Sequence, residues 1–205
     1  ESGAVPGSVN MSISGASDQL QATRDALVSN YIVAIIIIYL LLVAIFSHWG
    51  YPLLIMTTIP FGVAGGILGL WLFNLGGAWL PLIGMSELHL SFDMIAMLGF
   101  LILMGTVVNN PILIVHQAMT NVRDRGMQAL DAVRHAVDAR LRPIAMSTLT
   151  TVFGLAPLVF LAGEGTELYR GVGVIVMFGL LGTAIVSLTF LPALTALVLK
   201  YSSSD

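Results

Sequence analysis

Five long apolar segments constrain the fold of this 205-residue chain more than any other feature. They span residues 28–46, 52–73, 94–115, 144–162 and 171–199. A helix needs about 20 apolar residues to cross the hydrocarbon core of a bilayer, and each segment comes within a few residues of that length or exceeds it. Only 9% of the residues are charged, whereas soluble domains carry about 25%. The sequence therefore predicts an all-α membrane protein with five transmembrane helices.

The first 27 residues differ from the rest because Ser, Gly, Asn and Gln are frequent there. Apolar and polar residues alternate over positions 9–14, which predicts a short strand, and residues 18–25 then suit a helical lead-in. We interpret 1–27 as the end of a periplasmic domain. Three transmembrane helices are expected over 28–115 and two over 144–201, and 202–205 form a tail.

The positions of the basic residues predict the orientation. Five arginines fall within 117–143 and Lys200 follows the last segment, whereas only Arg24 and Arg170 belong to the opposite side. Basic residues are enriched in cytoplasmic loops. We therefore expect a multi-pass protein with a periplasmic N-terminus and a cytoplasmic C-terminus.

The stretch 116–143 between the third and fourth segments contains a further helical pattern. Apolar residues recur at spacings of three and four from Met127 to Leu141, and charged residues occupy another face. This pattern predicts a cytoplasmic amphipathic helix on the membrane surface. A plain soluble connector helix would also fit.

Glycine and proline occur inside the apolar segments. Gly62 and Gly66, like Gly65 and Gly69, form small-xxx-small pairs that permit close helix contact. Four segments contain a proline, which removes a backbone donor and crowds the carbonyl four residues earlier. Pro60, Pro111, Pro157 and Pro192 therefore predict kinks.

The third segment contains the most informative polar run, GTVVNNPILIV at 105–115. Two adjacent amides are costly in a membrane unless they are hydrogen-bonded, so Asn109 and Asn110 should face protein. Thr106 falls near the stripe of Asn109 at helical spacing. The amides either hold helices together or form a polar coupling site at the centre of the bundle.

The fourth segment adds a group of hydroxyl side chains that includes Ser147 and Thr148. Such hydroxyls either bond to carbonyls of their own helix or meet the stripe of Asn109. No Asp, Glu, Lys or Arg lies deep inside a segment, and His116 sits near a helix end, where an interfacial role suits it. A proton relay normally needs an ionisable group within the membrane, so these residues alone lack one.

Other classes of function find no support. The chain has no cysteine and none of the common sequence motifs of hydrolases, zinc proteases, nucleotide binding or dinucleotide binding. No basic face suggests nucleic-acid binding. We expect no enzyme activity, no catalytic residue, no metal and no cofactor.

These residues resemble the C-terminal membrane half of RND (resistance-nodulation-division) efflux transporters. The similar stretches are SHWGYP at 47–52, the glycine-rich 60–69, the polar run at 107–115, DAVRHAVDARLRPIAM at 131–146, and 154–157. The resemblance covers nearly the whole chain, and its R-L-R-P-I motif is specific.

The resemblance implies proton-driven export of amphiphilic small molecules by a homotrimer in the bacterial inner membrane. It also implies a periplasmic adaptor, an outer-membrane channel, and an N-terminal membrane half that supplies the coupling carboxylates. Many drug exporters of this family have lysine where Asn109 stands and threonine where Ser147 stands. Arg140 matches a family arginine near the cytoplasmic proton exit, although a positive-inside role fits equally well. Without the lysine, the family's coupling network does not carry over directly.

Two alternatives stay open. The first is an RND relative that handles lipids or assists protein translocation. The second is a membrane scaffold without transport activity. Carboxylates inside a span of the N-terminal half would favour coupled transport over both.

Overall fold

The computed structural model describes residues 16–77, 90, 92–161 and 163–202, and its regular structure there is entirely helical. The helices are α1 (Ala16–Phe46), α2 (Gly50–Met56), α3 (Thr58–Gly77), α4 (Met94–Val107), α5 (Asn109–Arg125), α6 (Ala129–Phe160) and α7 (Glu164–Ser202). Five stretches are long and apolar enough to cross a membrane: Asp25–Phe46, Gly50–Gly77, Met94–Arg125, Ala129–Phe160 and Gly165–Lys200. The prediction of an all-α membrane fold with five spans is confirmed. The strand expected at 9–14 lies outside the described residues.

Two of the five spans are each divided into two helices, at positions that proline chemistry explains. α2 ends at Met56 and α4 ends at Val107, each four residues before a proline, Pro60 and Pro111 respectively. The proline ring crowds the carbonyl of the residue four positions earlier, and the proline nitrogen has no hydrogen to donate to it. Near the first break the Thr58 hydroxyl donates to the carbonyl of Ile55, at 2.7 Å. Helices α6 and α7 continue through their own prolines.

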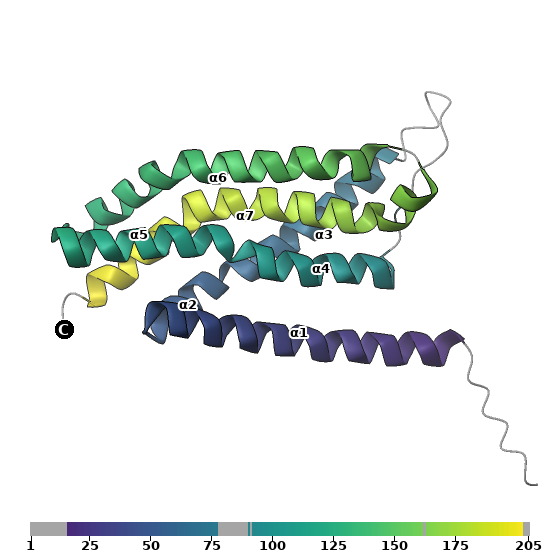
Figure 1. Cartoon of the computed structure of the whole chain (residues 1–205), viewed down its shortest axis with the longest axis horizontal. Helices are drawn as coiled ribbons and strands as arrows, with labels where there is room; N and C mark the ends of the chain where they lie inside the picture. Colours follow the sequence, from purple (N-terminus) through teal and green to yellow (C-terminus); the bar gives the residue numbers. More distant parts are fainter. Residues whose placement is uncertain (1–15, 78–89, 91, 162, 203–205) are drawn as a thin grey trace, which may run out of the picture.

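Helix α7 is the centre of the bundle and contacts α3, α4, α5 and α6. Figure 1 shows it between α6 and the α4–α5 span, while α3 crosses behind and α1 lies apart along one side. The α1–α2 turn, the α5–α6 turn and the C-terminal part of α7 lie at one end of the bundle (left in Figure 1). The end of α3, the start of α4 and the α6–α7 turn lie at the other.

Glycines allow α3 and α7 to approach closely, as their spacing predicts. A Cβ atom on Gly182 would lie 3.3 Å from the Cα of Gly65, and one on Gly65 would lie 3.1 Å from the carbonyl oxygen of Phe178. Backbone meets backbone at this contact, so small residues are required there. Close approach of this kind increases dispersion contacts, which drive helix association when lipid is the solvent.

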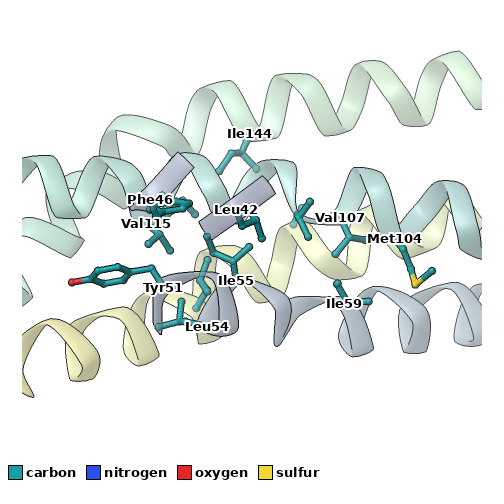
Figure 2. Close-up of a cluster of buried hydrophobic side chains, with 14 of the residues drawn as sticks. Leu42, Phe46, Tyr51, Leu54, Ile55, Ile59, Met104, Val107, Val115 and Ile144 are labelled. Carbon is teal, nitrogen blue, oxygen red and sulfur yellow. The ribbon is translucent and has the colours of Figure 1, made fainter. Parts of the chain in front are cut away.

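Helix α1 packs mainly on α2 and α4, through one narrow face. Leu42 and Phe46 on that face join a buried apolar cluster with side chains of α2, α4, α5 and α6, several of which are drawn in Figure 2. Most of the remaining surface of α1 is apolar and exposed. In a chain whose solvent is the bilayer, such a surface suits contact with lipid or with further helices.

The predicted amphipathic helix exists, but it is joined to the fourth span without a break. α6 runs from Ala129 to Phe160 through Pro143. Val133 (2% exposed) and Ala136 (0%) are buried within the bundle, whereas Leu130 remains exposed. The buried face therefore packs on protein, which periodicity alone does not distinguish from packing on the membrane surface.

Candidate functional site

The break between α4 and α5 positions the predicted polar residues. Thr106 lies one residue before the end of α4, and Asn109 and Asn110 begin α5. Asn110 is buried (7% exposed) and Asn109 is exposed. The Thr106 hydroxyl donates to the carbonyls of Ile102 and Leu103 in its own helix. Within the described part of the chain, neither asparagine side chain makes a hydrogen bond.

Asn109 and Thr106 line a groove between α1 and the α4–α5 span. The groove has a volume of about 390 Å³ and is otherwise apolar. Its walls are Ile37, Ile38, Leu41 and Leu42 of α1 and Gly105, Thr106, Val108, Asn109 and Ile112 of the α4–α5 span. The structure thus brings Thr106 and Asn109 together on one surface, and the Asn109 amide is a polar group without a partner in an apolar setting.

The hydroxyls of α6 are not on the wall of this groove. The Ser147 hydroxyl donates to the carbonyl of Ile144 at 3.0 Å, and Thr151 donates to the carbonyl of Ser147 at 2.9 Å. Ser147 is exposed and Thr148 is buried (8% exposed). Ser147 and Thr151 therefore bond to carbonyls of their own helix, which is one of the two interpretations of these hydroxyls.

Arg140 lies in a second polar group, between α5 and the first part of α6. Its Nη2 donates to Oε1 of Gln117 at 3.0 Å, and Gln117 Nε2 donates to Oδ1 of Asn121 at 3.3 Å. Asn121 is fully buried, and its Nδ2 donates to the carbonyl of Ala132 at 3.0 Å. His135 Nδ1 lies 3.5 Å from the same nitrogen. Side chains of both helices therefore form one hydrogen-bonded seam.

The sequence reasoning missed Gln117 and Asn121. Both are amides one helical turn apart on α5, a spacing at which side chains interact, and this was the available signal. Their partners on α6 are distant in sequence, so only the folded chain identifies them. His116, for which an interfacial role was expected, packs its ring edge-on against Phe46, with the ring centres 6.2 Å apart.

Comparison with known proteins places these features in a family. The model of the AcrB/AcrD/AcrF family matches residues 1–199. The chain belongs to the AcrB/AcrD/AcrF family. The resemblance to RND efflux transporters is thereby confirmed, and the polar break at Asn109 and the seam at Arg140 are features of a member of that family.

Relatives agree with the family assignment. The multidrug resistance protein MdtC of Edwardsiella ictaluri is 32% identical over 187 residues, which cover 91% of this chain and 17% of the relative. MdtC of Salmonella enteritidis is 31% identical over 188 residues, again 17% of its length. This AcrB/AcrD/AcrF family chain therefore spans about a sixth of the length of the curated relatives it matches.

Proposed function

We propose that the chain is part of the C-terminal membrane half of a proton-coupled RND exporter that moves amphiphilic small molecules out of the cell. The family match, the five apolar spans and relatives named as multidrug resistance proteins support this function. The protein works in the bacterial inner membrane together with an N-terminal membrane half. The further partners are two more copies in a homotrimer, a periplasmic adaptor and an outer-membrane channel.

The observation that carries the proposal is the exposed Asn109 amide on an otherwise apolar groove. A polar group in the membrane needs a partner, and the described residues provide none. We place the groove against the N-terminal half, whose intramembrane carboxylates would accept hydrogen bonds from the Asn109 amide. Thr106 shares this surface with Asn109.

The remaining predicted site residues lie outside the groove, and we propose that they assist the coupling from there. Asn110 is buried beside Asn109 at the start of α5, and Ser147 and Thr148 lie on α6. Arg140 lies at the cytoplasmic end, where the proton would leave, and Gln117 holds its guanidinium. In this arrangement the neutral amides and hydroxyls of this chain orient the carboxylates of the N-terminal half, and those carboxylates carry the proton.

The test is a dye-efflux assay in cells that express the whole transporter, with protein level measured by western blot. Asn109→Leu removes the amide at similar volume, so export should fall while expression stays near normal. Thr150→Val is the matched control, because Thr150 is also exposed but bonds within its own helix; its export should be unchanged. A protonophore should abolish export in the unmodified protein. Normal efflux by Asn109→Leu would reduce Asn109 to a packing residue.

The proposed orientation has its own test. Single cysteines at Gly76, at the end of α3, and at Gln128, between α5 and α6, occupy exposed positions at opposite ends of the bundle. In intact cells a membrane-impermeant thiol reagent should label the first and not the second. Labelling of both from outside would contradict the topology.

A further inference from the structure

A buried arginine occupies the end of the bundle that holds the α6–α7 turn. Arg170 lies in the second turn of α7 and is only 6% exposed. Its Nη2 donates to the carbonyl of Leu161 at 3.1 Å, and its Nε is buried without a partner among the residues that the structure describes. A guanidinium is always charged and carries five N–H donors. Within the described part of the chain, the Leu161 carbonyl therefore leaves the buried Nε–H of this cation without an acceptor.

That single acceptor is also shared. The Thr166 hydroxyl donates to the same Leu161 carbonyl at 3.0 Å, and a carbonyl oxygen has two lone pairs. Leu161 is the C-cap residue of α6, so the cation is favourably placed near the negative end of that helix dipole. This placement explains the Nη2 contact but gives no acceptor to the buried Nε.

The direction of Arg170 shows where a further acceptor must come from. Val174, one turn later on the same side of α7, is fully buried within an apolar cluster. The preceding residues Leu168 and Tyr169, at 55% and 50% exposed, form the outward surface of the helix. Arg170 is therefore turned into the bundle near its end. A further acceptor is therefore expected at this end of the bundle rather than at the outward face of α7.

No carboxylate among the described residues pairs with Arg170. Asp93 uses its Oδ1 to accept the backbone N–H of Ala96 at the start of α4. Glu167, one turn before Arg170, is exposed and forms no ion pair with it. Buried charges are normally paired, so the missing anion lies outside the described residues.

We propose that Arg170 receives a carboxylate from the extramembrane part of the whole exporter and thereby fastens the α6–α7 turn to that part. The proposal rests on the proposed function, which places this end of the bundle on the periplasmic side. The curated relatives are about six times longer than the stretch matched here, so the extra chain is available. A bidentate carboxylate fits the free Nε edge of a guanidinium.

Photo-crosslinking in the full-length transporter tests this assignment. A benzoylphenylalanine probe replaces Thr166, one turn before Arg170, so that the arginine itself is kept. Mass spectrometry then identifies what the probe captures. We expect an extramembrane peptide with an Asp or Glu, loss of this product in Arg170→Gln, and retention in Arg170→Lys, which keeps the charge. The same probe at Tyr169 is the control and should capture lipid.

Other outcomes would overturn the assignment. Capture of lipid alone at Thr166 would make Arg170 a headgroup ligand, and capture of the segment containing Glu87 would make its partner local. A product that persists unchanged in Arg170→Gln would mean that the arginine does not hold the contact. If Arg170→Gln fails to accumulate, the identity of the peptide captured in the unmodified protein and in Arg170→Lys still shows whether the partner is extramembrane. Efflux is measured in the same cells: the expected crosslink without efflux would sink the proposed function and leave this contact standing.

Discussion

Replacing Gly62 with alanine tests a tightly packed contact between three helices of the bundle. A Cβ atom at Gly62 would lie 2.5 Å from Cγ2 of Val107 on α4 and 2.8 Å from Oγ1 of Thr183 on α7. Carbon atoms in good contact are about 3.5–4.0 Å apart, so the neighbours must yield by about 1 Å. Val107 and Thr183 are both fully buried and lie on two different helices, so relieving one clash does not relieve the other.

The magnitude follows from two opposing effects. Extra methyl groups in a tight core cost about 1–3 kcal/mol, while alanine is better than glycine in a helix by about 0.5–1 kcal/mol. Gly154→Ala in α6 isolates the second effect, because nothing lies within 4 Å of a Cβ at that position. The difference in unfolding free energy between the two variants therefore reports the packing cost alone. Gly62→Ala should be less stable than Gly154→Ala by about 1–3 kcal/mol.

The assay is reversible unfolding of the purified protein in mixed detergent micelles, followed by circular dichroism. Both variants and the unmodified protein are measured under one set of conditions. Gly62→Ala should be the least stable of the three and Gly154→Ala equal to or slightly more stable than the unmodified protein. Equal stability of the two variants would refute the argument, because it would mean that α3, α4 and α7 are not in tight contact at Gly62.

Three further substitutions test other contacts. Asn74→Ala removes two hydrogen bonds to the backbone of Leu90, at 3.0 and 2.8 Å. Hydrogen exchange of the Leu90 amide should therefore rise by the equivalent of about 1–3 kcal/mol; unchanged protection of that amide would contradict these contacts. Val133→Asp buries a carboxylate and should abolish membrane retention, whereas the exposed Arg134→Gln should not; equal tolerance in a fractionation blot would contradict the packing of α6. Asn121→Leu leaves a backbone carbonyl of α6 without its donor and should lower the unfolding free energy by about 1–3 kcal/mol; a neutral result would mean that water replaces the amide.

Sequence spacing predicts some contacts of the candidate site but not others. The helical spacing of Thr106 and Asn109 predicts that they share a face, and both line the groove beside α1. Only the folded structure decides between the two roles of Ser147, because its hydroxyl can reach either its own backbone or a neighbouring helix. The partner of Arg140, Gln117, is 23 residues away, and no periodicity links the two positions.

The sequence by itself determined the five spans, because length and hydropathy act within one segment. It predicted kinks at four prolines, and only the structure distinguished Pro60 and Pro111, where helices end, from Pro157 and Pro192, through which helices continue. Tertiary structure decided what each surface faces. It joined the amphipathic helix to the fourth span and buried Val133 against protein. It also buried Arg170, which hydropathy and charge placement had counted only as one basic residue on the outer side. Burial depends on which helices meet, and that information is spread over the whole chain.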